Sequence, residues 1–227
     1  MFICSLTTLL FIQGCDSSKK VITFLAIDNS LSNVSNADNR KKSQEICKSV
    51  VKKQSEIDDL TLVEFNSDAD DPRPRSLSNS NDDSRASFIR YECSAVAKDP
   101  PKGSEPGTDI RPTFQRQFEV IKSNLSSQNQ SELKVIHVFV FSADALEGAN
   151  YQLGDTKAME FKSSVGKFLG SGNFLMIFIN DDTDREKLSR FLKDFVTKYK
   201  ERLYIGDAKT PQNYQKKISQ FYAEARK

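Results

Sequence analysis

Short apolar runs alternate with segments of helical periodicity along most of the chain. Apolar runs bounded by turn residues are typical of buried strands, whereas apolar residues three and four positions apart are typical of amphipathic helices. Strands are therefore expected at residues 21–27, 60–65, 88–96, 134–142, 173–180 and 202–206. Helices are expected at residues 39–54, 109–125, 156–170, 184–199 and 213–226, the last one after Pro211.

The order of these elements predicts a doubly wound α/β fold. Strictly alternating helices and strands are typical of a mostly parallel sheet that is covered by helices on both faces. The second and third strands, at residues 60–65 and 88–96, are expected to pair as an edge hairpin with one antiparallel edge strand. In such sheets ligands bind beyond the carboxyl ends of the strands, where the chain reverses direction across the sheet.

One polar stretch interrupts this order. Residues 66–87 are rich in Ser, Asn, Asp and Pro, a composition that cannot supply a core, so we expect an exposed loop there. The chain of 227 residues is long enough for one sizeable core. We therefore expect a single domain at residues 21–227 with the polar loop as an insertion.

The first residues read as a targeting segment. Residues 1–14 carry no charge and are mostly apolar, with a length typical of a signal-peptide core. The sequence around Ile12, Gly14 and Cys15 resembles the lipobox of bacterial lipoproteins, which implies cleavage before Cys15 and lipidation of its thiol. Residues 15–20 would then form a short tether. The alternative is an apolar N-terminal strand that is followed by a chance cysteine.

This resemblance also implies a location, the bacterial cell envelope. Asp16 directly follows the cysteine, and in a Gram-negative host that residue implies retention at the periplasmic face of the inner membrane. An exported chain can form disulfides. Cys47 and Cys93 remain as an even pair, either bonded to each other or present as two buried thiols.

Charge and histidine content exclude several functions. The 33 basic and 31 acidic residues give a net charge of +2 and are interspersed, so no nucleic-acid partner is indicated. His137 is the single histidine and lies inside an apolar run, where it is expected to pack in the core. Because no Cys/His cluster is present, a zinc site is not expected.

Oxygen-bearing side chains follow the first expected strand. The stretch "FLAIDNSLSNVS" places Asp28, Ser30 and Ser32 at alternate positions directly after the apolar run. Two later turns carry similar groups, with Thr108 before an expected helix and Asp144 after the most apolar strand. Carboxylates combined with hydroxyls suit a hard cation such as Mg²⁺, which prefers six oxygen ligands and retains some of its water.

Together these five residues resemble the metal-ion-dependent adhesion site of von Willebrand factor A (vWA) domains. That family has a DxSxS motif, a later Thr and a still later Asp, in this order, and its fold has the same order of elements. The resemblance implies that Asp28, Ser30, Ser32, Thr108 and Asp144 hold Mg²⁺ (or Mn²⁺). It also implies that a partner protein supplies a Glu or Asp to the open coordination position, with no catalysis.

The match has one departure and one neighbouring acid. The last turn, "SADA", has Ala143 before Asp144 and lacks the glycine that is common in the family. Asp109 stands beside Thr108, either as a group behind the metal ligands or as a carboxylate that caps the following helix.

Two other functions remain open. An Asp at the end of a first strand also begins the pattern of haloacid-dehalogenase-like phosphatases, in which Asp28 would attack phosphorus. That pattern requires a second Asp where this chain has Ser30. In the other alternative the metal site is degenerate, Asp28 and the serines only cap a helix, and the chain is a structural lipoprotein.

Overall fold

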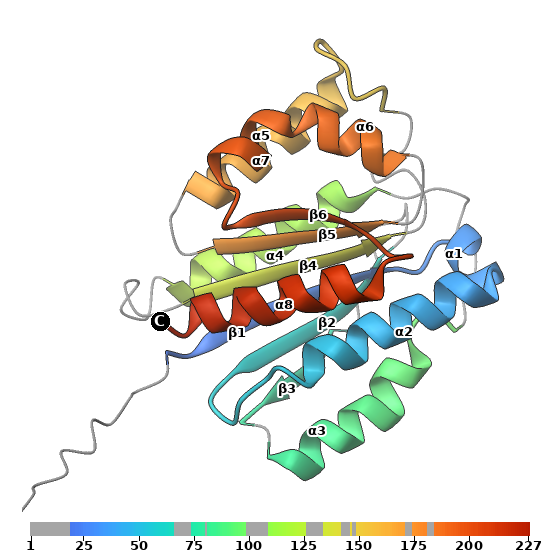
Figure 1. The fold of residues 1–227 in the computed structure, drawn as a ribbon, viewed down its shortest axis with the longest axis vertical. Coiled ribbons are helices and arrows are strands. Elements are labelled where there is room, and N and C mark those ends of the chain that lie inside the picture. The colour runs from blue at the N-terminus through green and yellow to red at the C-terminus, as the bar shows by residue number, and fades with distance from the viewer. Residues whose placement is uncertain are drawn as a thin grey trace, which may run out of the picture.

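Six strands form one sheet in the order β3-β2-β1-β4-β5-β6 (Figure 1). The computed structural model describes residues 19–65, 74–79, 81–98, 109–125, 134–141, 146, 149–170, 174–180 and 184–227. Its strands are β1 (Val21–Asp28), β2 (Asp59–Phe65), β3 (Arg75–Ser78), β4 (Lys134–Phe141), β5 (Phe174–Asn180) and β6 (Leu203–Asp207). Only the edge pairing of β3 with β2 is antiparallel. The predicted α/β fold class is confirmed.

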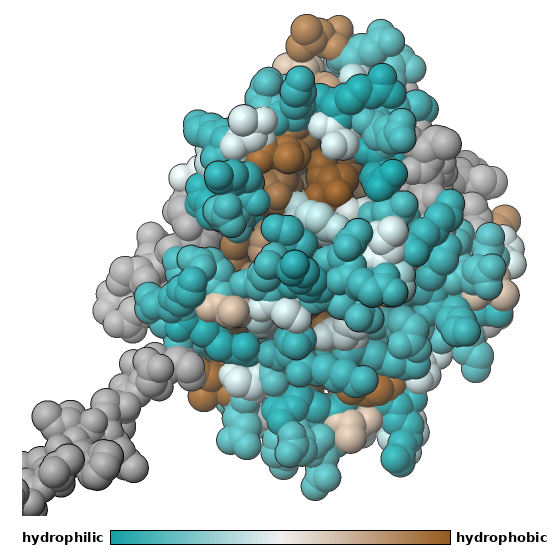
Figure 2. Space-filling view, viewed as in Figure 1, coloured by the Kyte–Doolittle hydropathy of each residue, from teal (hydrophilic) through white to brown (hydrophobic). Residues whose placement is uncertain are grey.

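Helices cover both faces of the sheet (Figure 1). One face packs against α2 (Ala37–Val51), α3 (Asp82–Phe88), the π-helix η1 (Ile89–Cys93) and α8 (Pro211–Ala225). The other packs against α4 (Ile110–Leu125), α5 (Thr156–Gly170), α6 (Asp184–Phe191) and α7 (Lys193–Lys198). A short helix, α1 (Leu31–Ser35), joins β1 to α2. Figure 2 shows that the outer surface over α8 and α2 is mainly hydrophilic, as expected of amphipathic helices.

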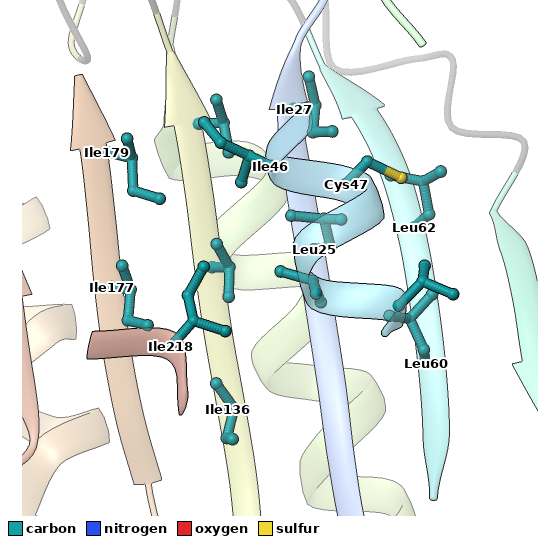
Figure 3. Packing of buried hydrophobic residues seen from close by; sticks show 14 of the residues in the cluster. Leu25, Ile27, Ile46, Cys47, Leu60, Leu62, Ile136, Ile177, Ile179 and Ile218 are labelled. Carbon is teal, nitrogen blue, oxygen red and sulfur yellow. The ribbon is translucent and has the colours of Figure 1, made fainter. Parts of the chain in front are cut away.

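The central strand β1 is apolar along its length because both of its faces are buried. Leu25 and Ile27 point toward α2 and α8, where they pack near Ile46 and Ile218 (Figure 3). Phe24 belongs to the cluster on the opposite face. Because β1 lies between β2 and β4 in the middle of the sheet, its end lies near the middle of the row of strand carboxyl ends.

The prediction of a strand at residues 88–96 is wrong, because residues 88–95 are helical and a turn follows. The helix begins after Asn81, whose side-chain oxygen accepts a hydrogen bond from the backbone N–H of Ser84 at 2.8 Å. Such a cap satisfies a donor that the first helical turn leaves without a partner. Phe88 and Cys93 then face the core from consecutive turns.

The stretch at residues 66–87 is not entirely an exposed loop. Within it Arg75–Ser78 forms β3, and the first turns of α3 follow. The expected antiparallel edge strand is therefore present, but it is formed by these residues. Leu77 pairs with Leu60 and is the only buried side chain of β3. A single buried residue in a polar segment gives no detectable alternation, which explains the error.

The remaining expected elements are present in the described residues. The helix expected at residues 184–199 is divided into α6 and α7 at Leu192, where a ψ of 12° interrupts the helical backbone. Leu188 and Leu192 are both buried, so the division keeps the apolar side of the pair on the sheet.

A disulfide joins α2 to η1. The sulfur atoms of Cys47 and Cys93 are 2.10 Å apart, and both residues are fully buried. Of the two alternatives that the sequence leaves open, the structure has the disulfide. Cys15 and the expected signal segment at residues 1–14 lie outside the described residues.

A buried carboxylate fastens the C-terminal helix to the start of the sheet. Asp58 accepts hydrogen bonds from the backbone N–H groups of Val21 at 3.0 Å and Ser55 at 2.7 Å. It also forms an ion pair of 2.6 Å with Arg226, which directly follows α8. Its side chain is fully buried, and these three donors offset the cost of removing the carboxylate from water.

We expect Asp58→Asn to lower the free energy of unfolding by about 2 kcal/mol, because an amide loses the ion pair and leaves buried donors poorly matched. The adjacent Asp59 offers a control, since its side chain is 32% exposed and makes a surface ion pair with Lys20. Asp59→Asn should cost less than about 1 kcal/mol. Urea unfolding of both variants measures the difference, and equal losses would contradict the role given to Asp58.

Candidate metal centre

The end of β1 buries a carboxylate and a hydroxyl. Asp28 and Ser30 are both fully buried. The carboxylate oxygen Oδ1 of Asp28 accepts a hydrogen bond from the backbone N–H of Ser30 at 2.8 Å. The N–H of Asn29 bonds to the carbonyl of Phe65 at 2.6 Å, which extends the pairing with β2 by one residue before the chain turns. Two of the five predicted ligands are thus held by one tight turn.

Ser30 stands at the N-terminus of α1. Its carbonyl accepts the N–H groups of Asn33 and Val34, both at 3.0 Å, but its side chain does not cap the helix. The degenerate-site alternative assigns capping to Asp28 and both serines; the Asp28 carboxylate accepts the N–H of Ser30, whereas the Ser30 hydroxyl makes no capping bond. The backbone of Ser32 lies in α1, and its side chain lies outside the description.

Asn33 supports the turn and was missed from the sequence. Its side-chain Nδ2 donates to the carbonyl of Asp28 and, at 3.4 Å, to Oγ of Ser43 in α2. The residue is 1% exposed. It therefore links the motif turn to the next helix. The signal available in the sequence was an amide side chain, Asn33, directly after the last serine of the motif.

The sheet places this turn at a topological switch point. The chain leaves β1 toward β2 on one side and later returns to β4 on the other, so direction across the sheet reverses between β1 and β4. Ile27 is in register with Val140, which puts Asp28 beside Phe141, the last residue of β4. Ligand sites of open α/β sheets form in the crevice at such a point.

Thr108 and Asp144 lie outside the described residues. The chain next to each of them is described, because Asp109 and Leu146 form an isolated antiparallel β-bridge. Asp109 directly follows Thr108 in the sequence, and Leu146 is two residues after Asp144. Phe141, three residues before Asp144, ends the strand beside Asp28.

Asp109 directly precedes α4. Its Oδ1 accepts the backbone N–H of Arg111 at 2.9 Å, which caps the helix. The same carboxylate pairs with the guanidinium of Arg111 at 2.7 Å, and this contact raises the pKa of Arg111 above its ordinary value. Arg111 also pairs with Glu160 of α5 at 3.1 Å. The capping interpretation accounts for Asp109 without a metal.

The donor set fits a hard cation. Asp28 supplies carboxylate oxygen and Ser30 supplies hydroxyl oxygen, and Mg²⁺ and Mn²⁺ both prefer such ligands. The described residues contain no group of three or more His, Cys, Asp and Glu side chains that could hold a metal ion by themselves. A site here would therefore depend on the hydroxyls and on residues from the other two turns.

Other features of the described chain do not add to this centre. His137 is fully buried, as expected of a core residue, and its ring lies 4.4 Å from that of Phe168, centroid to centroid. None of the helices in the described ranges is both long and apolar enough to cross a membrane.

Comparison with known proteins relates the chain to others by structure alone. No protein-family model and no curated protein matches its sequence. A von Willebrand factor type A structure from Catenulispora acidiphila superposes with a TM-score of 0.60 at 11% identity, over 92% of this chain and 43% of that one. An aerotolerance-related membrane protein from Bacteroides fragilis superposes with a TM-score of 0.53 at 16% identity, over 90% and 99%. The chain thus spans less than half of the first protein. The chain has the fold of vWA domains.

Proposed function

We propose that this chain is a divalent-metal-dependent protein-binding domain of the bacterial cell envelope, anchored by lipid at Cys15. One observation carries the proposal: a buried Asp28 and Ser30 share a tight turn at the switch point of a vWA-type sheet. Burying a carboxylate is costly unless hydrogen bonds or a cation compensate it. The sheet gives this turn the position where such folds bind ligands.

Five residues would hold Mg²⁺ (or Mn²⁺) in this proposal: Asp28, Ser30, Ser32, Thr108 and Asp144. When bound, the metal would supply a Lewis-acidic position for a Glu or Asp carboxylate of the partner protein. The chain's own part is to orient the ligands. Asn33 fixes the turn by donating to the carbonyl of Asp28, so the carboxylate is positioned before any metal arrives.

The proposal predicts metal binding that depends on the turn. Calorimetric titration with Mg²⁺ and Mn²⁺ should show binding by the natural chain. Ser30→Ala should weaken it at least about tenfold, since one of few ligands is lost. Asp28→Asn should abolish it, because the amide carries no charge. Ser163→Ala, at an exposed position of α5, is the matched control and should bind like the natural chain.

Circular dichroism accompanies each titration, so that a loss of metal binding is not confused with unfolding. If all variants fold and the natural chain shows no heat at millimolar metal, the proposal fails and the structural lipoprotein remains.

Partner capture tests the second half of the proposal. Affinity purification from solubilised membranes, with and without EDTA, should recover a protein only when metal is present. The same protein should be lost with Ser30→Ala. Hydrolysis of a generic phosphate ester that Asp28→Asn abolishes would instead favour the phosphatase, and would contradict the assignment as a non-enzymatic domain.

A further inference from the structure

Several basic residues lie where the strands begin, along the row of strand amino ends, which we call the edge. Lys20 and Lys134 precede β1 and begin β4, and the N–H of Lys134 bonds to the carbonyl of Lys20 at 3.5 Å. Arg202 directly precedes β6, and its carbonyl accepts the N–H of Met176 in β5 at 2.7 Å. These basic residues therefore lie at the amino ends of their strands, at the end of the sheet opposite the candidate metal centre.

Helix ends add further cations to the same edge. Lys52 and Lys53 follow α2, and Arg226, which follows α8, donates to the carbonyl of Lys53 at 2.6 Å. Lys200 lies in the turn between α7 and β6. Figure 1 shows the end of α8 and the start of β1 together at this end of the molecule.

The acidic residues of this edge do not cancel its charge. Asp58 pairs with Arg226, Asp59 with Lys20, and Glu224 with Lys227. Two further acidic residues, Glu56 and Glu201, lie in the turns of this edge, against five further Lys and Arg residues. We define these five further cations as the basic edge: Lys52, Lys53, Lys198, Lys200 and Arg202.

We propose that the basic edge lies against an anionic lipid surface. Positive charge of this kind is attracted to anionic headgroups, an effect worth about fivefold in partitioning for each cation near the surface. The attachment point of the preceding chain agrees with this, because Lys19 leads into β1 on the same edge. The inference rests on the proposed lipid at Cys15. Cys15 is four residues before Lys19, so even a fully extended chain would keep the two residues within about 14 Å of each other.

This contact would orient the proposed function. The eight residues of β1 separate Lys20 from the turn after Asp28, a distance of roughly 25 Å. With the basic edge on the lipid, the carboxyl ends of the strands face away from it. The candidate metal centre would then be presented to partners rather than to the membrane.

The test uses the full chain with Cys15→Ser, so that no lipid is attached, in EDTA. Sedimentation with phosphatidylcholine vesicles is compared with vesicles containing about one-third phosphatidylglycerol, at about 0.05 and 0.5 M salt. We expect binding to the anionic vesicles that the higher salt removes. The triple variant Lys52→Glu/Lys53→Glu/Lys200→Glu, at exposed positions, should lose at least about tenfold in that binding.

A matched control reverses three exposed lysines elsewhere, Lys41→Glu/Lys187→Glu/Lys209→Glu, with the same change in net charge. It should bind anionic vesicles severalfold better than the edge variant. Equal binding by the two variants would overturn the proposal, as would equal binding to neutral vesicles. If the chain binds heparin but no vesicles, and the edge variant loses the heparin binding, the partner is an acidic macromolecule and the proposal is overturned. Because EDTA is present throughout, this result is independent of the metal titration.

Discussion

Replacing both Cys47 and Cys93 with alanine should lower the free energy of unfolding by more than about 4 kcal/mol. The bond closes a loop of 46 residues, and a cross-link of that span restricts the unfolded chain by roughly this amount. The structure adds a second cost, because both residues are fully buried between α2 and η1 and alanine leaves small voids there. Urea unfolding of the natural and variant chains measures the total.

Reduction separates the two contributions. The natural chain in dithiothreitol keeps both sulfur atoms in the core but loses the cross-link, so it should unfold at a urea concentration between those of the oxidised chain and the double variant. If the reduced chain is as stable as the oxidised one, the disulfide contributes nothing to stability. The same result would show that the cross-link between η1 and α2 does not stabilise the fold.

The pattern of apolar residues was sufficient for elements that bury a whole face. The runs at β1, β4 and β5 are almost continuously buried, and α5 has apolar residues at helical spacing, so their positions follow from periodicity. The edge was different. Leu77 is the only buried residue of β3, so nothing in its pattern distinguished that strand from a loop.

The misassigned segment at residues 88–96 shows how local composition can mislead. Phe, Ile and Tyr favour strands, and the alternation was loose enough to accept one. The capping residue Asn81 lay inside the stretch that was interpreted as a loop, so the helix start was overlooked. The bond from Cys93 to Cys47 then fixes the segment on α2, a tertiary contact that no local pattern could reveal.

The candidate site was predictable in position but not in detail. An apolar run that ends in "IDNSLS" places Asp28 and Ser30 at a strand end, and the structure has them there, buried in one turn. The support from Asn33 could not be predicted, because it depends on the packing of α2 against that turn. Convergence of Thr108 and Asp144 on the same point stays a prediction, to which the pairing of Asp109 with Leu146 lends support.

Acid should destabilise the folded chain through His137. The imidazole ring packs among four phenylalanines, Phe24, Phe114, Phe139 and Phe168, at centroid distances of 5.1, 6.1, 5.7 and 4.4 Å. Neither ring nitrogen has a hydrogen-bond partner in the described structure. Burial lowers the pKa of His137 from 6.5 to about 3, since nothing nearby compensates a charge on the ring.

The direction of the effect follows from proton binding. Below pH 6.5 the unfolded chain binds a proton at this residue while the folded chain does not, so stability falls as pH decreases toward the folded pKa. Its contribution is fully present above pH 6.5. Between about pH 7 and pH 4.5 the loss from this one group should reach about 2.5 kcal/mol.

The variant His137→Leu removes the proton site and keeps an apolar side chain in the aromatic pocket. Urea unfolding at a series of pH values should show a stability that falls less steeply below pH 6.5 than that of the natural chain, by up to about 1.4 kcal/mol per pH unit. Because the chain has one histidine, the difference between the two profiles reports this ring alone. Parallel profiles, or an imidazole NMR signal that titrates near its ordinary pKa in the folded chain, would show that His137 is not held neutral by its burial among the phenylalanines.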